Sequence, residues 1–266
     1  MEHRESPLIS LDWVTFVLKL ALVPTFVGAV SLAGRHWGPT VSGWLVGLPL
    51  TSGPVTFFLA LEQGNTFAAA ATQATMMGII SVAVFSLAYT RLAAHTSWLP
   101  SMIGGILAWV GSTFLLENLE VGLAIGFVTV LCITVISVLL IPHVKSDRKA
   151  RFSPRWEIPG RMLSATILVF LITGVAQALG PKLTGLLTPF PIYATVLAVF
   201  TQRYETANHA IRLLRGVVVG SVTSTIFLLI VSSTIIGWGV GYAFLAAICV
   251  SSVTHTTIFY FLKSHN

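Results

Sequence analysis

Apolar runs about 20 residues long recur along this chain, and they constrain its fold more than any other feature. A run of this length is needed for a helix to cross roughly 30 Å of hydrocarbon. Of the 266 residues, 55% are hydrophobic and 9% are charged, whereas roughly 25% are charged in a typical soluble domain. The sequence therefore predicts an all-α, polytopic integral membrane protein whose residues 1–266 form a single transmembrane domain.

The apolar runs, read between charges and turn residues, predict about nine membrane-spanning helices. The predicted spans are 13–34, 40–61, 66–90, 98–116, 120–142, 160–179, 183–201, 207–233 and 238–262. The loops between them are short except for one basic segment, His143 to Arg161, so no separate extramembrane domain is expected.

The basic segment 143–161 predicts the orientation of the chain. Loops rich in Lys and Arg lie on the cytoplasmic side of a membrane protein, so we expect this loop in the cytoplasm and the protein in the plasma (inner) membrane. Membrane topology explains this positive charge better than nucleic-acid binding does, so no nucleic-acid partner is expected. Counting spans outward places one group of basic residues on the cytoplasmic side: Arg35, Arg91, Arg203, Arg212, Arg215 and Lys263.

Two predicted spans carry helix-breaking residues near their centres. GWLVGLPLTSGPVTFFLALEQG contains Pro49 and Pro54, and GLLTPFPIYATVLAVFTQ contains Pro189 and Pro191. A proline inside a span frees backbone carbonyls that hydrocarbon cannot satisfy, so such a site survives where protein buries it or where it lines a wet cavity. Proline kinks without any ligand are the simpler alternative.

Paired breaks in two halves of a chain favour a transporter built from inverted repeats. The broken spans are the second and the seventh, which would therefore cross in opposite directions; re-entrant hairpins are the alternative. The predicted repeat halves are 10–117 and 160–263, linked by a helix over 120–142 and a cytoplasmic basic loop over 143–159. The arrangement resembles inverted-repeat secondary transporters in architecture alone, which transfers no substrate and no residue role.

The leading functional hypothesis is a permease that moves a small solute, for which an anion is one candidate, by alternating access. Coupling to a proton or sodium gradient is expected. The predicted solute-binding residues are Thr51, Ser52, Gly53, Pro54, Thr56, Thr188, Pro189, Pro191, Tyr193, Thr195 and Arg212. The predicted coupling residues are Glu62 and His209, because a carboxylate drawn below the interface can carry a proton and histidine titrates near neutral pH. An ordinary extracellular turn is the alternative for Glu62.

The start of the eighth predicted span supports a second hypothesis. Glu205, His209, Arg212 and Arg215 recur at three- and four-residue spacings and share one helix face. Such a face could hold a lipid phosphate in a membrane-embedded lipid-handling protein or enzyme. Positive-inside anchoring explains the arginines equally well, and Glu205 with His209 could be a local pair. A noncatalytic subunit of a larger complex is a third hypothesis, and the composition is compatible with a homo-oligomer.

Signatures of enzymes are weak in this sequence. GxSxG, HExxH, P-loop and dinucleotide motifs are absent, so neither a metal nor another cofactor is expected and a transporter is favoured over an enzyme. Ser112 with His255 would be a poor signal for an intramembrane hydrolase. For His255 an interhelical hydrogen bond is the preferred reading, and Cys132 and Cys249 are predicted to be small core residues.

Overall fold

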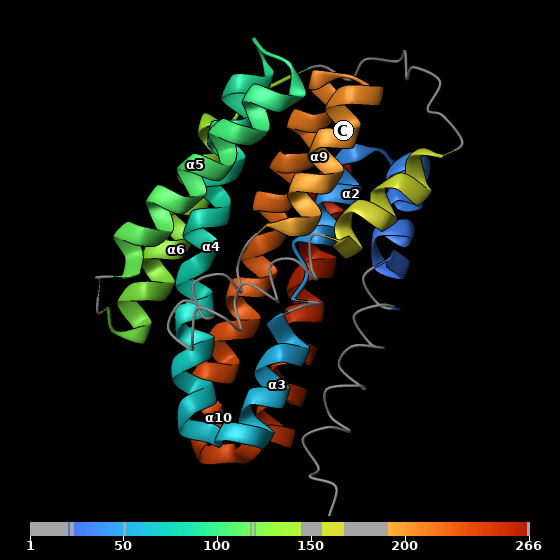
Figure 1. The fold of residues 1–266 in the computed structure, drawn as a ribbon. Coiled ribbons are helices and arrows are strands. Elements are labelled where there is room, and N and C mark those ends of the chain that lie inside the picture. The colour runs from blue at the N-terminus through green and yellow to red at the C-terminus, as the bar shows by residue number, and fades with distance from the viewer. Residues whose placement is uncertain are drawn as a thin grey trace, which may run out of the picture.

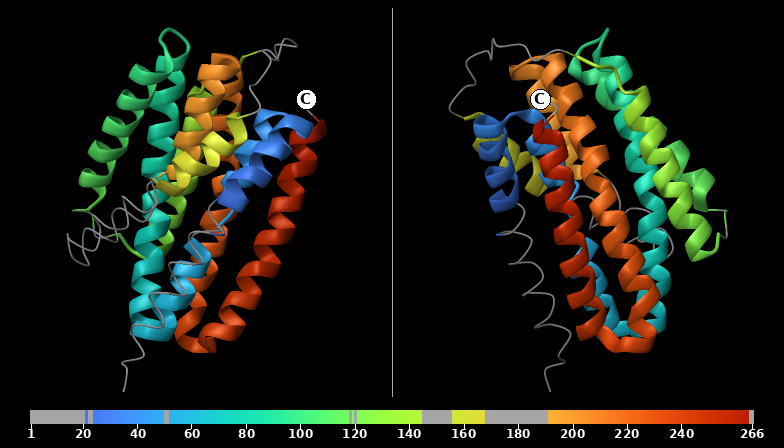
Figure 2. Two further views of the ribbon diagram at one scale, coloured as in Figure 1. Left: turned by 45° about the vertical axis from the view of Figure 1, so that its right-hand side comes forward. Right: turned by 180° about the vertical axis from the view of Figure 1, so that it is seen from behind.

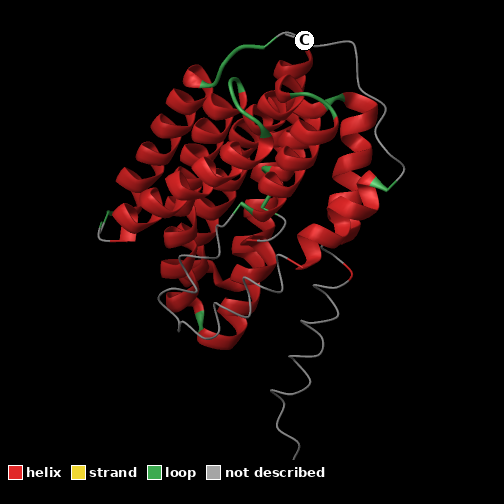
Figure 3. Cartoon of the chain, turned by 45° about the horizontal axis from the view of Figure 1, so that its top comes forward, coloured by secondary structure: helices red, strands yellow, loops and turns green. Residues whose placement is uncertain are grey.

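The computed structural model describes residues 21, 24–49, 52–117, 119, 121–144, 156–167 and 191–264. Within these residues the regular elements are all helices, as Figures 1 and 3 show, which confirms the all-α prediction. Two helices cover 24–37 and 157–167. The others are α2 (Pro39–Val46), α3 (Ser52–Gln63), α4 (Asn65–Ala93), α5 (Trp98–Glu117), α6 (Leu123–Leu140), α9 (Ile192–Tyr204) and α10 (Ala207–Ser264).

Four of the described helices, α4, α5, α6 and α10, are long and apolar enough to cross a membrane. An integral membrane protein is therefore compatible with the structure, whereas nine separate spans are not what the described residues show. Long stretches of three predicted spans, 13–34, 160–179 and 183–201, lie outside the described residues, as do residues 50, 51 and 120 of two others.

The predicted span over 40–61 consists of two short helices. Helix α2 ends at Val46, a turn follows at Gly47 to Pro49, and α3 begins at Ser52. Pro54 then falls in the first turn of α3, where the missing N–H of proline costs nothing. The interruption expected from the two prolines is therefore a true break in the helix, and it separates pieces that are each too short to cross a bilayer.

Helix α10 joins two predicted spans, 207–233 and 238–262. Its backbone is non-helical at Gly239, where φ is 76°, a conformation that favours glycine. The chain reverses direction at Gly239, so the two arms on either side of it run in opposite directions, as both views of Figure 2 show. Thr223 Oγ1 of the first arm and His255 Nδ1 of the second lie 3.0 Å apart. We call these parts the first and second arms of α10.

The helices that flank the two proline clusters run in opposite directions (Figure 1). Helix α3 runs from the middle of the molecule to one end, where the chain turns into α4. Helix α9 runs from the middle to the other end, where the chain turns into the first arm of α10. Helix α4 and the first arm consequently pack against each other in antiparallel directions.

Contacts tie together the end of the bundle at which α4 finishes and α10 begins. Arg91 donates from Nε to the carbonyl of Leu140 at the end of α6, at 3.1 Å. Gln202 of α9 donates from Nε2 to the carbonyl of Thr96, just before α5, at 2.9 Å. Arg35 pairs with Glu157 at the same end. The basic residues predicted to share one side therefore lie at one end of the bundle, and the cytoplasmic location of that end stays a prediction.

Two sequence-based expectations, one about the cysteines and one about the basic loop, are wrong. Cys132 and Cys249 are exposed on α6 and α10 and are not part of the core, because the lipid-facing side of a membrane helix is as apolar as its buried side. The basic loop also ends earlier than predicted, because a helix covers 157–167 and buries Glu157 and Arg161.

Candidate functional site

A cavity of about 120 Å³ lies where the two proline-containing segments meet. One wall comes from the break between α2 and α3, and a second from the start of α9. The remaining walls come from the middle of α4 and from the first arm of α10. The described residues that line it are Val46, Gly47, Leu48, Ser52, Thr75, Ile79, Val82, Pro191, Ile192, Tyr193, Ala194, Val217, Ser221, Ser224 and Leu228. We call this space the central cavity.

The central cavity lies between two separate clusters of buried apolar side chains. Val217 and Ala194 belong to the cluster nearer the α9–α10 turn. Leu228 and Ile79 belong to the cluster nearer the α3–α4 turn. The cavity is therefore remote from both ends of the bundle, at the depth where the breaks in a membrane-spanning fold meet.

A hydrogen bond from another helix stabilises the break at Gly47. Ser224 of the first arm donates its hydroxyl to the Gly47 carbonyl at 2.5 Å. The Gly53 N–H bonds the Pro49 carbonyl at 2.9 Å, which starts α3. A carbonyl left free by the break thus finds a donor inside the protein, as the low-dielectric surroundings require.

Backbone-to-backbone packing fixes α2 against the first arm of α10. A Cβ atom added at Gly43 would overlap the Leu213 carbonyl, and one added at Gly216 would overlap the Thr40 carbonyl. Gly47 and Gly220 approach each other in the same way. The two helices therefore meet through a pair of GxxxG patterns, 43–47 and 216–220, which place the break directly against α10.

The lining of the central cavity is uncharged in the described part of the chain. Its polar groups are hydroxyls, of which Thr75 and Ser221 each donate to a carbonyl of their own helix, at 2.9 and 2.7 Å. Both α3 and α9 begin at the cavity, so the positive ends of two helix dipoles converge there. The site combines hydroxyl groups, apolar walls and a small positive potential.

Some of the predicted solute-binding residues are brought together at this cavity and others are not. Ser52, Pro191 and Tyr193 line it, and the Tyr193 ring also packs edge-on against Phe26 with centroids 5.1 Å apart. Three predicted residues lie outside the described residues: Thr51, Thr188 and Pro189. Three others are described in α3 and α9 but are not among the lining residues: Gly53, Thr56 and Thr195. The backbone of Pro54 lies in the first turn of α3.

The predicted charged residues lie away from the central cavity. Glu62 belongs to the last turn of α3, ten residues from Ser52, which is about 15 Å at 1.5 Å per residue. Arg212 is half-buried near the start of α10 and does not line the cavity. His209 is buried one turn earlier, where it takes part in a separate group of charges.

Sequence reasoning missed the residues that α4 and α10 contribute. Thr75, Ser221 and Ser224 line the cavity although no proline beside them marks a break in a helix. The signal that could have found the serines is the GxxxG pattern at 216–220, since a small-residue face predicts close contact with a helix carrying a matching pattern.

A buried group of charges lies at the end of the bundle where α9 meets α10. Arg35 Nη2 is 3.2 Å from Glu157 Oε2, and Arg161 Nη2 pairs with Glu157 Oε1. The same Arg161 nitrogen is 3.3 Å from Glu205 Oε1, whose second oxygen is 2.8 Å from His209 Nδ1. We call these five residues the ion cluster. They join the helix over 24–37, the helix over 157–167, and the α9–α10 turn.

The centre of the ion cluster is shielded from solvent. The Glu157 side chain is 2% exposed and that of Arg161 is 5% exposed, whereas that of Arg35 is 46% exposed. Arg161 also donates to Thr201 Oγ1 at 3.2 Å and lies over the Phe200 ring, 6.0 Å from its centroid. Glu205 and His209 do form the predicted i, i+4 pair, but it is one side of a network that sequence spacing could not reveal.

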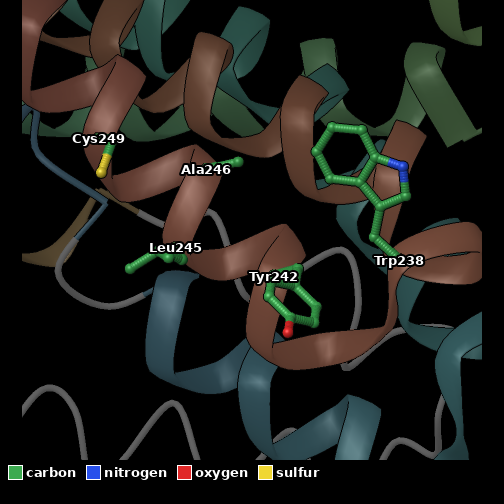
Figure 4. A pocket seen from close by; sticks show the side chains of 5 residues that line it. All are labelled: Trp238, Tyr242, Leu245, Ala246 and Cys249. Carbon is green, nitrogen blue, oxygen red and sulfur yellow. The ribbon is translucent and has the colours of Figure 1, made fainter.

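A larger hollow lies on the outer side of the second arm of α10 (Figure 4). It is lined by Trp238, Tyr242, Leu245, Ala246 and Cys249. No polar surface contributes to it, and its lining side chains come from one helix. In a membrane protein such a surface faces lipid, so this hollow is not taken as the functional site.

The weak hydrolase signal does not correspond to a site. Ser112 Oγ lies 3.2 Å from Ser81 Oγ of α4, whereas His255 contacts Thr223 and stacks on Trp44 with ring centroids 3.6 Å apart. The two residues thus have separate partners, and His255 has the interhelical role that the sequence favoured. Among the described residues, no group of three His, Cys, Asp or Glu side chains could hold a metal ion.

Comparison of the chain with protein-family models, with curated proteins and with solved structures finds no match. Function has to be argued from the central cavity and the ion cluster themselves.

Proposed function

We propose that this protein is a secondary transporter that binds a small solute in the central cavity and moves it by alternating access. The observation that carries the proposal is that two proline-containing segments far apart in the sequence line the same cavity: Gly47–Ser52, where the chain passes from α2 to α3, and Pro191–Tyr193, where α9 begins. Kinks that served packing alone would have no reason to converge.

The size and lining of the cavity favour a small solute. Its volume of about 120 Å³ is below the roughly 300–1,000 Å³ of pockets for drug-sized ligands. The start of α3 and the start of α9 both lie at the cavity wall, which favours an anionic group over a cationic one. The hydroxyls of Ser52, Thr75 and Ser221 would fix its orientation.

The opposite directions of the flanking helices support the proposal of an inverted repeat. Helix α3 followed by α4 corresponds to α9 followed by the first arm of α10, with each pair turned around relative to the other. In transporters of this kind the site lies where the two repeats meet, and rocking of one against the other exposes it to each side in turn.

The experiment that tests the proposal is a ligand screen by thermal unfolding of the purified protein in detergent. The panel contains organic anions, amino acids, sugars, amines and metal ions, each at two pH values and with or without sodium. A ligand of the native state raises the midpoint with its concentration, by about 2.7 kcal/mol of stability at 100 times Kd. We expect a saturable stabilisation by a small solute, in the best case an organic anion.

The control for this screen separates the cavity from the rest of the surface. Ser221→Leu fills the cavity wall and is expected to abolish the stabilisation, whereas Ser233→Leu on an exposed position of the same helix is expected to keep it. Stabilisation that survives Ser221→Leu would place the ligand elsewhere. Stabilisation by anionic lipid alone would contradict the proposal.

A second candidate function rests on the arginines near the start of α10. Arg212 and Arg215 are half-buried, and neither pairs with a carboxylate among the described residues. A half-buried arginine without a counter-charge suits a phosphate, so an anionic lipid headgroup is the alternative ligand. This lipid-handling role would be favoured if phosphatidylglycerol copurifies with the protein, if Arg212→Ala and Arg215→Ala both remove it, and if the screen finds no stabilising solute.

A further inference from the structure

The central cavity and the ion cluster are connected by one short helix. Helix α9 begins at the cavity wall beside Pro191, and its last turn places Thr201 against Arg161. The next residue after α9, Glu205, is a member of the ion cluster. Helix α9, which has 13 residues, therefore contacts the central cavity at its start and the ion cluster at its end.

Counted over its five members, the ion cluster is electrically neutral when His209 is neutral. Two guanidinium groups, from Arg35 and Arg161, then face two carboxylates, from Glu157 and Glu205. A proton taken up by the Glu205–His209 pair adds one positive charge, whichever of the two groups holds it. Arg161 is attracted less strongly to the α9–α10 turn in that state and keeps Glu157 as its full counter-charge.

Other ionisable groups near the Glu205–His209 pair are few among the described residues. Helix α2 contains no ionisable residue, and the ionisable residue of α5 is Glu117, at the opposite end of that helix. Arg203 is exposed and lies over the Trp98 ring, 5.2 Å from its centroid. The remaining described groups at this end are His36, Arg91, His95 and His143, which are exposed, Tyr204, whose ring packs on Trp156, and Arg212 and Arg215, one and two turns further along α10.

We propose that the Glu205–His209 pair is the proton-binding site of the transporter and that Arg161 acts as a latch responding to it. This inference rests on the proposed function. In the unprotonated state Arg161 holds the helix over 157–167 against the α9–α10 turn and closes this end of the molecule. Proton uptake releases Arg161 from Glu205, α9 moves, and the cavity opens toward the end at which Arg35 lies. The pair thereby takes over the coupling role that the sequence assigned to Glu62 with His209.

The test measures access to the cavity with a cysteine at its wall. Ser221→Cys is placed in a chain whose two exposed cysteines are changed, Cys132→Ala and Cys249→Ala, and the protein is reconstituted in phosphatidylcholine–phosphatidylglycerol vesicles. A membrane-impermeant maleimide is added to one face at a time at pH 5.5 and 7.5. Rates are divided by those of the same cysteine in unfolded protein, which cancels the pH dependence of the thiol. Glu117→Gln, which changes a carboxylate at the far end of α5, is the matched control and is expected to keep the pH dependence of labelling.

With the ion cluster intact, we expect the normalised labelling rate from the Arg35 face to be about tenfold higher at pH 5.5 than at pH 7.5. A change of this size corresponds to a modest shift of a two-state equilibrium. Glu205→Gln imitates the neutral carboxyl and is expected to label quickly at both pH values. His209→Gln, which keeps a polar group of similar length, is the second variant, to be used if Glu205→Gln fails to fold. It is expected to lose most of the pH dependence of labelling.

Two results would overturn the latch and leave the transporter proposal standing. The first is equal labelling at both pH values with the ion cluster intact. The second is a pH dependence that Glu205→Gln and His209→Gln leave unchanged, because the proton would then bind elsewhere. A cysteine at position 221 that reacts from neither face under any condition would count against the proposed function as well.

Discussion

The central cavity and the ion cluster place polar chemistry inside the same apolar bundle in two different ways. The cavity is uncharged in its described lining and is built on backbone: broken helices, hydroxyls and glycine contacts between α2 and α10. The ion cluster is built on side chains, with four charged groups and a histidine gathered from three segments of the chain. We propose that the first region binds the solute and that the second binds the coupling proton.

The difference also predicts how each region tolerates change. Charges removed from water are costly unless they are paired, so loss of one partner leaves a buried charge without compensation. Backbone contacts through glycine fail for a steric reason that does not depend on charge or pH. The following substitutions are ordered from the largest expected effect to the smallest.

Arg161→Gln is expected to destabilise the protein most, by about 3–5 kcal/mol, because Glu157 and Glu205 lose their shared counter-charge. The free energy of unfolding in detergent, from heat or denaturant titration, measures the effect. Arg203→Gln is the matched control, because that arginine is exposed over Trp98 and contributes about 0.5–1 kcal/mol at most. Equal losses for the two variants would show that the ion cluster adds nothing beyond a surface contact.

Gly43→Ala is expected to cost about 3 kcal/mol, since its Cβ would overlap the Leu213 carbonyl and force α2 away from α10. Gly111→Ala of α5 is the control, because a Cβ there meets no atom within 4 Å, and the helix gains up to about 1 kcal/mol from the better helix former. The unfolding measurement decides between opposite signs. A stabilising Gly43→Ala would contradict the close contact of the two helices.

Ser224→Ala is expected to cost about 1–3 kcal/mol, because the Gly47 carbonyl at the break loses its donor inside the protein. Ser233→Ala, whose hydroxyl bonds a carbonyl of its own helix at an exposed position, should stay within about 0.5 kcal/mol of the parent. If the two serine variants behave alike, the hydroxyl of Ser224 does not stabilise the break.

Cys132→Ala and Cys249→Ala are expected to have the smallest effect, within about 0.5 kcal/mol together, because both side chains are exposed on outer helix faces. A larger loss would mean that these residues are buried in a contact between copies of the chain, which cross-linking of the parent protein would then detect.

The sequence predicted those parts of the fold that depend on local chemistry. Apolar runs predict helices, and the prolines at 49 and 54 predict the interruption that separates α2 from α3. A glycine between two apolar runs is consistent with the bend at Gly239. Each of these follows from residues within a few positions of one another.

Contacts between distant residues could not be predicted in this way. Arg35 and Glu157 are 122 positions apart, and Ser224 and Gly47 are 177 apart. Counting positive charge treated 143–161 as a solvated loop, and the helix that begins at 157 corrects this because pairing allows Glu157 and Arg161 to be buried. Sequence spacing found the pair of Glu205 and His209 but not Arg161, which contacts Glu205.

The most direct test of the central claim is whether the cavity between the breaks can be reached from both sides of the membrane. Thr75→Cys on the α4 wall, in a chain without Cys132 and Cys249, is treated with an impermeant maleimide from each face of the vesicle in turn. Alternating access predicts labelling from both faces, with a stabilising solute slowing both reactions. Labelling from one face alone, unchanged by solute, would contradict transport and leave a fixed binding site.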